Sequence, residues 1–193
     1  MKYKVFLVFV LFGLNQLMAQ NKDKATFFKQ PKGFVYVPQK ASSPAFYVME
    51  TPVKNDEFYK FTTWLYEQGR MIDANTCKLA TPDELDTRNP YVVFSNIKPI
   101  LLYADYLSKK LSDSTHIVSC KLISENQWKQ MLGPADGQVP AKKNPYGIIY
   151  VKGIYEWKLN SKNEGVTFTD INGYQESSFR LMLTYINRTP SKK

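Results

Sequence analysis

The stretch from Asn55 to Gly69 has the start, the spacing and the stop of an amphipathic helix, which constrains the fold more than any other segment. Asn55 can cap the first turn, and Asp56 and Glu57 suit the positive end of the helix dipole. Apolar residues then recur on one face, and Gly69 ends the pattern; the apolar residues are Phe58, Phe61 and Leu65. The sequence therefore predicts a helix that buries this face against other elements.

Two further segments have helical signals. Pro99 suits the first turn of a helix, and apolar residues follow it at helical spacing as far as Leu111. Ser124 and Gln127 predict a capping box, in which the Ser124 hydroxyl accepts from the Gln127 amide and the Gln127 side chain accepts from the Ser124 amide. Gly133 is expected to end this short helix.

Short runs of β-branched and aromatic residues predict strands. Asn172-Gly173 is typical of a tight turn between the last two of them, and Arg70 to Pro90 and Pro134 to Asn144 are predicted as loops. Short strands with separate helices indicate an α+β fold. The predicted strands lie at Phe34–Val37, Phe46–Met49, Val166–Thr169 and Phe179–Ile186.

The chain of 193 residues, 44% of them hydrophobic, suits one domain with a core. Lys2 and Lys4 precede an apolar run from Val5 to Leu14, so residues 1–20 are predicted as a secretory signal peptide cleaved near Ala19 or Gln20. That run is short for a transmembrane helix, so we expect no membrane anchor after cleavage. The remaining regions are expected to be a flexible lead (21–30), the domain (31–187) and a basic tail (188–193).

The predicted export places the protein in the periplasm, at the cell surface or in the medium. There, Cys77 and Cys120 either form one disulfide or remain two buried thiols, and the sequence leaves both open. The formal net charge of +9 favours acidic partners. Its lysines are scattered rather than aligned in a stripe, and no nucleic-acid-binding motif accompanies them, so we expect no nucleic-acid partner.

Three stretches resemble motifs of one known family. Lys121-Leu122-Ile123-Ser124-Glu125-Asn126-Gln127-Trp128 is similar to R-L-P-T-E-x-E-W, Asn144-Pro145-Tyr146-Gly147 to the start of N-P-x-G-L-x-D-M, and Glu156-Trp157 to the end of N-V-x-E-W. These are motifs of the formylglycine-generating enzymes, also called sulfatase-modifying factors. The opening strand, Asn55 with its helix, and Ser178-Phe179-Arg180-Leu181 resemble further family segments in the same order.

The resemblance implies a single irregular domain with a C-type-lectin-like core, short strands and two to three helices. It assigns structural roles to ten residues, with Glu125 at a helix terminus and Glu156 in buried hydrogen bonds. Lys121 stands in place of the family's arginine, which gives up a bidentate contact. The ten are Asn55, Lys121, Ser124, Glu125, Trp128, Asn144, Gly147, Glu156, Trp157 and Arg180.

The catalytic segment of the family is the largest departure. Its copper-binding, substrate-oxidising cysteines precede the final strand, but Trp157 to Phe179 contains no cysteine. Copper(I) needs soft thiolate ligands, so we expect no oxidase chemistry. Tyr150 and Ile154 stand where the family has calcium-associated Asp and Asn residues, so we expect no cofactor, with calcium as the alternative.

Other candidate sites have simpler interpretations. His116 is the only histidine and has no nucleophile motif, so we expect a surface or strand-edge residue. Asp170 to Gly173 contains oxygen ligands for calcium, but a hairpin turn explains the same residues. Glu125 and Glu156 could be the two carboxylic acids of a glycoside hydrolase, but the resemblance gives both of them structural roles.

Tyrosines in loop contexts are the candidate binding residues, because exposed tyrosines stack on sugars and grip protein partners. We expect an exported, non-catalytic interaction module of the cell envelope, related to gliding-motility and type IX secretion lipoproteins but without their lipid anchor. A carbohydrate- or ligand-binding module is the alternative, and an enzyme of another chemistry is a third. The partner is thus an envelope protein or a glycan; the candidate tyrosines are Tyr91, Tyr146, Tyr150, Tyr155 and Tyr174.

Overall fold

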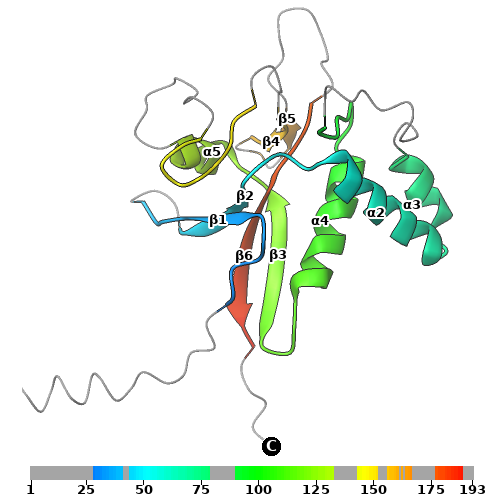
Figure 1. The fold of residues 1–193 in the computed structure, drawn as a ribbon, viewed down its shortest axis with the longest axis horizontal. Helices are drawn as coiled ribbons and strands as arrows, with labels where there is room; N and C mark the ends of the chain where they lie inside the picture. Colours follow the sequence, from blue (N-terminus) through cyan, green and yellow to red (C-terminus); the bar gives the residue numbers. More distant parts are fainter. Residues whose placement is uncertain are drawn as a thin grey trace, which may run out of the picture.

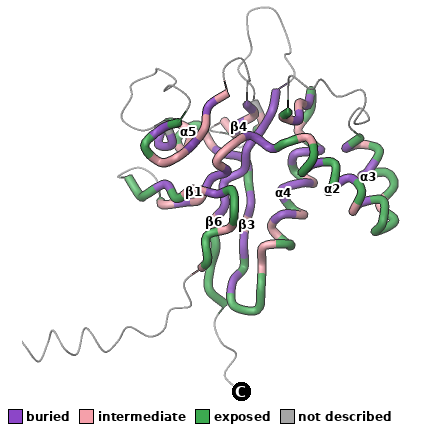
Figure 2. The backbone as a smooth tube through the Cα atoms, in the orientation of Figure 1, coloured by how far each residue is buried: buried purple, intermediate pink, exposed green. Residues whose placement is uncertain are grey.

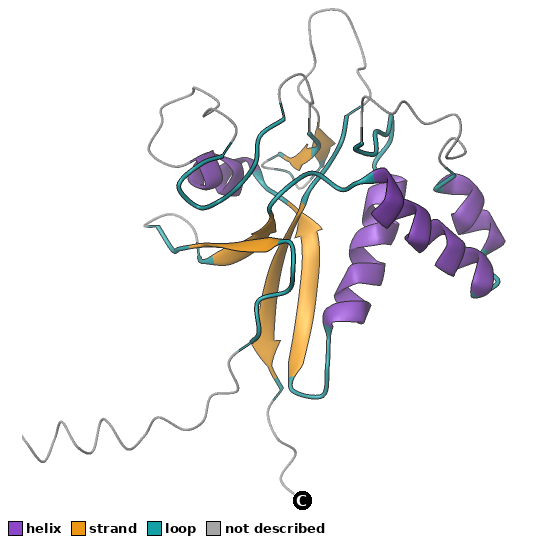
Figure 3. Ribbon diagram, viewed as in Figure 1, coloured by secondary structure: helices purple, strands orange, loops and turns teal. Residues whose placement is uncertain are grey.

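The computed structural model describes residues 28–40, 44–78, 90–132, 143–151, 156–160, 162, 164–166 and 177–188. These residues form an α+β fold, in which helices pack on both faces of a small antiparallel sheet (Figure 1, Figure 3). The elements in chain order are β1 (Phe34–Val37), β2 (Phe46–Met49), α2 (Asn55–Glu67), α3 (Met71–Thr76), α4 (Lys98–Leu111), β3 (His116–Leu122), α5 (Glu125–Leu132), β4 (Lys158–Leu159), β5 (Gly165–Val166) and β6 (Leu181–Asn187).

The main sheet has the strand order β1-β2-β6-β3, and every neighbouring pair is antiparallel. β3 and β6 pair along their whole length, from His116 opposite Asn187 to Leu122 opposite Leu181. β2 meets β6 over only two residue pairs, and the β1–β2 hairpin runs across the long β3–β6 pair (Figure 1). β4 and β5 form a separate two-stranded ribbon.

Alternate residues of the sheet point to two separate cores, as strand geometry requires. We call the face that packs against α2 and α4 the helical face, and the other face, which packs against α5 and residues 143–151, the α5 face. Figure 2 shows buried residues along β3, in the first part of β6 and on the helices. The helical face includes Val118, Cys120, Leu181 and Leu183, and the α5 face includes Val37, Phe46, Val48 and Met182.

The predicted helices are confirmed, with one shift of a boundary. α2 spans Asn55–Glu67 and Gly69 follows it with φ +70°, while α4 has Pro99 in its first turn. The Ser124 capping box is present: Gln127 N donates to Ser124 Oγ at 3.3 Å, and Ser124 N donates to Gln127 Oε1 at 3.0 Å. Asn55 is the first helical residue rather than the cap, which is Lys54.

Three elements were not predicted: α3, β3 and the short strand β4. α3 lies inside the segment that was predicted as a loop, where it is held by the Arg70–Asp73 ion pair at 2.7 Å and by the burial of Ala74. The structure thus describes four helices where two to three were expected. β3 is an edge strand and begins at His116, so His116 is a strand-edge residue, as one of the two expectations had it; its side chain is buried, so the other expectation, a surface histidine, is wrong.

Several predictions concern residues outside the described part of the chain. These are the signal peptide (1–20), most of the lead (21–27), the turn at Asn172-Gly173, the calcium alternative at Asp170 to Gly173 and most of the tail (189–193). Residue 28, ahead of the expected domain start at 31, packs on the core. Among the helices that the structure describes, none is long and apolar enough to cross a bilayer.

Candidate interaction surface

Arg180 and Glu156 form a buried ion pair at the junction of three segments. Arg180 is 0% exposed, and its Nε and Nη2 donate to the two Glu156 carboxylate oxygens, each at 2.7 Å. The remaining guanidinium hydrogens go to the backbone carbonyls of Met49 at 3.3 Å, Glu50 at 3.2 Å and Ile149 at 3.0 Å. This satisfaction of both charges confirms the buried hydrogen-bonding role that was predicted for Glu156.

Asn144 organises the loop from 143 to 151 in a similar way. Its Nδ2 donates to the Met131 carbonyl at 2.6 Å, and its Oδ1 accepts from the amides of Tyr146 and Ile148, each at 3.0 Å. Gly147 has φ +93°, a conformation that favours glycine. Asn144 and Gly147 therefore have structural roles, as the resemblance implies.

Tyr150 is not a surface residue, contrary to the prediction from its loop context. It is 9% exposed, and its ring lies 6.4 Å from the ring of Trp128 and 5.7 Å from the Arg180 guanidinium carbon. Burial raises the pKa of its hydroxyl to about 12, and Asn144 Nδ2 donates to that oxygen at 3.4 Å. The side chain supports the buried ion pair and is closed to a large ligand.

The other predicted tyrosines do not form a common site in the described residues. Tyr146 is partly buried and packs on the α5-face core, and Tyr91 is partly buried opposite Lys54 in an isolated bridge. Tyr155 and Tyr174 lie outside the described residues.

The remaining motif residues stabilise local packing. Glu125 begins α5 and pairs with Lys158 at 3.5 Å, in agreement with its predicted place at a helix terminus. Trp157 Nε1 donates to the Phe94 carbonyl at 3.1 Å. Lys121 is exposed on β3.

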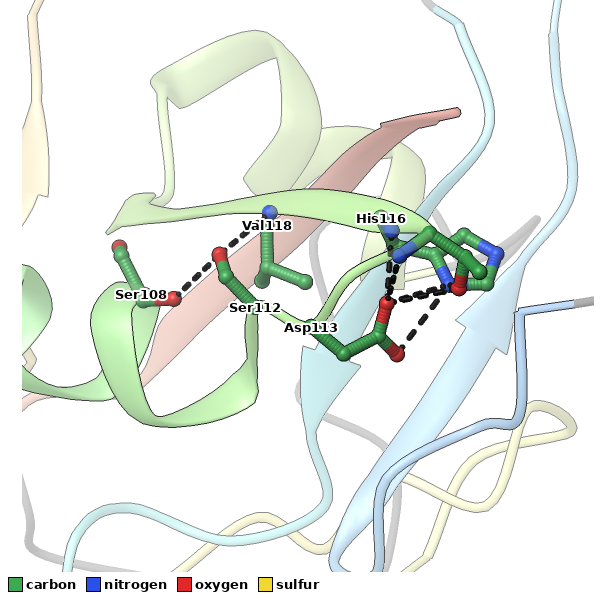
Figure 4. A network of polar contacts seen from close by, with 6 residues as sticks. Ser108, Ser112, Asp113, His116 and Val118 are labelled. Carbon is green, nitrogen blue, oxygen red and sulfur yellow. Dashed lines mark hydrogen bonds and ion pairs between the residues drawn. The ribbon is translucent and has the colours of Figure 1, made fainter. Parts of the chain in front are cut away.

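The outer edge of β3 is closed by side chains of α4 and the turn that follows it (Figure 4). The amide of Cys120 donates to Ser108 Oγ at 2.8 Å, and the amide of Val118 donates to Ser112 Oγ at 2.9 Å. The amide of His116 donates to Asp113 Oδ1 at 2.7 Å. These three outward N–H groups therefore have partners, and an edge with occupied donors is a poor template for an added strand.

The opposite edge strand, β1, is only four residues long. The Gln30 side chain donates to the Phe34 carbonyl, and the Phe34 amide donates to the Pro31 carbonyl at 3.2 Å. A short edge strand with local partners is also protected against strand addition. Neither edge is thus a favourable binding site, which leaves the faces of the sheet.

Three tyrosines from three neighbouring strands lie together on the helical face, beyond the part that the helices cover. We call Tyr36, Tyr47 and Tyr185 the tyrosine surface. The Tyr36 and Tyr47 ring centroids are 5.4 Å apart, and those of Tyr47 and Tyr185 are 6.3 Å apart. Tyr36 is 48% exposed and Tyr185 is 36% exposed, while Tyr47 is partly buried between them.

Sheet pairing explains why these tyrosines meet. Tyr36 is the direct partner of Tyr47, and Tyr47 is the partner of Leu183, two residues before Tyr185. Directly opposite and diagonal residues of an antiparallel sheet share a face and contact one another. Burial raises the pKa of Tyr47, and the neighbouring Tyr185 and Tyr36 add to this effect.

Sequence reasoning missed this surface because the three residues lie within predicted strands, where most aromatic residues are core. The relevant signal was the alternation of β1, which places Tyr36 on the same face as the buried Phe34. The register that joins Tyr36 to Tyr185 through Tyr47 comes from tertiary pairing.

Phe28 covers one end of the tyrosine surface. Its ring stacks on Tyr185 with centroids 4.2 Å apart and an interplanar angle of 18°, and it lies 5.7 Å from the ring of Tyr47. The His116 ring meets Phe28 edge-on at 5.4 Å and Tyr185 at 5.6 Å. Phe28 therefore occupies a space walled by three rings, those of Tyr47, Tyr185 and His116, which we call the Phe28 slot.

An open depression of about 640 Å³ lies beside the start of β3. Its lining includes Lys109, Asp113 and Arg188, which carry charges of both signs. Lys109 is already paired with Asp105 at 2.8 Å. The depression therefore offers no single sign of charge to a ligand, and the tyrosine surface is the stronger candidate.

The two cysteines are free thiols in the helical-face core. Burial raises the pKa of Cys77 to about 12 and that of Cys120 to about 11. Of the two states that the sequence left open, the structure therefore has two buried thiols and not a disulfide. Within the described residues, no three His, Cys, Asp or Glu side chains are grouped as metal ligands.

His116 belongs to a local polar network with the turn before β3. Its Nδ1 lies 2.7 Å from Thr115 Oγ1 and 3.2 Å from Asp113 Oδ1. Hydrogen bonds from the Thr115 hydroxyl, the Thr115 amide and the His116 amide hold the pKa of Asp113 well below its usual range. This network closes the β3 edge and stabilises the turn.

No family model matches the chain, and no curated protein or solved structure is similar enough to match it.

Proposed function

We propose that this chain is an exported, non-catalytic interaction module of the cell envelope, and that the tyrosine surface contacts its partner protein. The observation that carries the proposal is the position of Tyr36 and Tyr185, which remain 48% and 36% exposed beside Tyr47 on one face of the sheet. Tyrosine side chains are enriched at binding hot spots because they supply a large contact area with few rotatable bonds.

The pairing of β6 favours binding further. β6 pairs with β3 along its whole length, and Tyr185 lies directly opposite Val118, so Tyr185 loses little backbone freedom when a partner docks. The occupied amides of Val118 and Cys120 on the β3 edge favour recognition by side chains over addition of a strand.

The non-catalytic part of the proposal rests on the resemblance and on the absence of cysteine from Trp157 to Phe179. Arg180, Glu156 and Asn144 are engaged in buried structural contacts, which supports the interpretation of these motifs as scaffold. We also propose a specific fold within the α+β class, a sulfatase-modifying-factor-like domain with a C-type-lectin-like core. The absence of a cofactor and an association with gliding motility or type IX secretion are part of the same proposal.

Export rests on Lys2 and Lys4 ahead of the apolar run Val5 to Leu14. On this basis, the partner is a protein of the periplasm or cell surface. Removal of Lys2 and Lys4 with the signal peptide reduces the formal net charge from +9 to +7 (9 minus 2). This positive charge favours a partner with an acidic surface, since long-range attraction raises the rate of encounter.

Affinity capture from envelope extracts tests the proposal. The exported chain should recover a stoichiometric envelope protein, and the Tyr36→Ala/Tyr185→Ala variant should lose it. Tyr59→Ala is the matched control, because Tyr59 is also 48% exposed but lies on α2. Equal recovery by the native chain and the double variant would contradict a role for the tyrosine surface.

A carbohydrate is the second candidate ligand, favoured by the same three rings on one face, since tyrosine rings stack on sugars. A glycan array separates the candidates: sugar binding that disappears in Tyr36→Ala/Tyr185→Ala but persists in Tyr59→Ala would favour the carbohydrate. A cysteine peptide supplied with copper tests the oxidase alternative, and we expect no turnover.

A further inference from the structure

The Phe28 slot has the size and chemistry of a receptor for one flat aromatic ring. The Tyr185 ring forms one wall in parallel contact at 4.2 Å, and the Tyr47 and His116 rings meet the occupant at inclined angles of 57° and 73°. Stacked and edge-on contacts are the arrangements that aromatic pairs prefer. The slot is therefore specific for a ring in a way that an ordinary apolar patch is not.

Its present occupant is attached by a short, exposed segment. Only Lys29 and Gln30, both exposed, separate Phe28 from Pro31. Two hydrogen bonds anchor the base of this segment: the Gln30 side chain donates to the Phe34 carbonyl, and the Phe34 amide donates to the Pro31 carbonyl. Short tethers give an effective concentration in the millimolar range, so Phe28 fills the slot by default in the absence of a partner.

We propose that Phe28 is a removable plug, and that the partner protein inserts an aromatic side chain of its own into the Phe28 slot when it binds the tyrosine surface. This inference rests on the proposed function. Phe28 then lowers the apparent affinity for the partner, because each binding event must first displace it. The partner is a protein with an exposed Phe, Tyr or Trp that can replace the ring of Phe28.

His116 provides a direct readout of slot occupancy. It is the only histidine in the sequence, so a tag-free protein gives one set of imidazole proton resonances, and the Phe28 ring lies 5.4 Å from it. Phe28→Ala should shift these resonances by removing the ring, and Phe28→Leu, which keeps an apolar side chain, should shift them similarly. Unchanged resonances in both variants would overturn the assignment of Phe28 to the slot.

A peptide from the chain itself tests whether the slot accepts a ring in trans. The probe covers residues 24–32 with Phe27→Ala, so that Phe28 is its only aromatic residue, and the control peptide also carries Phe28→Ala. The probe should bind the Phe28→Ala protein at least tenfold more tightly than the native protein and return the His116 resonances toward their native positions. The control peptide should not bind, and Tyr185→Ala in the Phe28→Ala protein should abolish binding of the probe.

If the probe bound the native protein and the Phe28→Ala protein with equal affinity, the proposal that Phe28 is a removable plug would be overturned. The Phe28→Leu protein gives the same comparison if the alanine variant does not fold. Partner capture separates the two proposals. If capture of the partner depends on Tyr36 and Tyr185 but does not increase in Phe28→Ala, the plug is rejected and the proposed function stands. Capture that is independent of both tyrosines rejects the proposed function.

Discussion

The hydroxyl of Ser112, the residue that follows α4, accepts a hydrogen bond from the backbone amide of Val118 on β3 at 2.9 Å. The same hydroxyl donates to the Ser108 carbonyl at 2.8 Å, and Ser108 repeats the arrangement by accepting from Cys120 and donating to Ala104. Residues four apart on a helix and two apart on a strand have similar spacing, about 6 Å, so α4 can cover the strand edge with two serines.

Ser108→Ala and Ser112→Ala should each destabilise the protein by about 1–3 kcal/mol, because a strand amide loses its acceptor. Denaturant unfolding measures the loss, and hydrogen exchange should accelerate at Cys120 in the first variant and at Val118 in the second. Ser114→Ala is the control, since Ser114 is exposed in the turn. A double variant as stable as the native protein would show that α4 does not protect the edge.

Loss of one partner from the Arg180–Glu156 pair should destabilise the protein by about 3–5 kcal/mol, since the other charge stays buried. Arg180→Met and Glu156→Leu are the variants, and the double variant should cost less than the sum of the two. The control is Asp105→Ala, which breaks the exposed Lys109 pair and should cost less than about 1 kcal/mol. Strictly additive losses would contradict a coupled buried pair.

Because the pKa of Asp113 is lowered, the stability of the turn before β3 depends on pH. A carboxyl group whose folded pKa lies below its ordinary value of 3.8 stabilises the fold fully above that pH and loses this contribution as the pH falls. The difference in Tm between the native protein and Asp113→Ala should therefore be largest at neutral pH and close progressively below about pH 4. A difference that widens in acid would contradict the assigned hydrogen bonds.

Cys77 and Cys120 should be unreactive in the folded protein. With burial raising their pKa to about 12 and about 11, the thiolate fraction at pH 8 is small. A thiol reagent should modify both residues in denaturant, and in buffer at least about a hundredfold more slowly than an exposed cysteine. Intact mass spectrometry should find both thiols, and a mass lower by two hydrogens would reveal the disulfide instead.

Local sequence signals predicted the helices whose first turn, apolar spacing and end are marked by their own residues. Ser124 and Gln127 formed the capping box, and the helix after Asn55 followed the apolar spacing of Phe58, Phe61 and Leu65. α3 was missed because it has only six residues and depends on tertiary burial of Ala74. Such a short helix has little propensity signal of its own.

β3 was missed although its sequence alternates. His116, Val118, Cys120 and Leu122 point to the buried face, but the polar character of His116 hid the start of the pattern. Tyr150 was misassigned because its burial depends on Arg180, which is distant in sequence. The tyrosine surface likewise depends on pairing between strands that are far apart in the sequence, which no local pattern contains.

Site-specific photocrosslinking in cells tests whether the tyrosine surface contacts an envelope protein. A photoreactive phenylalanine analogue replaces Tyr36 in one strain and Tyr59 in another, since both positions are equally exposed. We expect one discrete envelope-protein adduct from position 36 and none from position 59. The same adduct from both positions, or from position 59 alone, would contradict an interaction through the tyrosine surface.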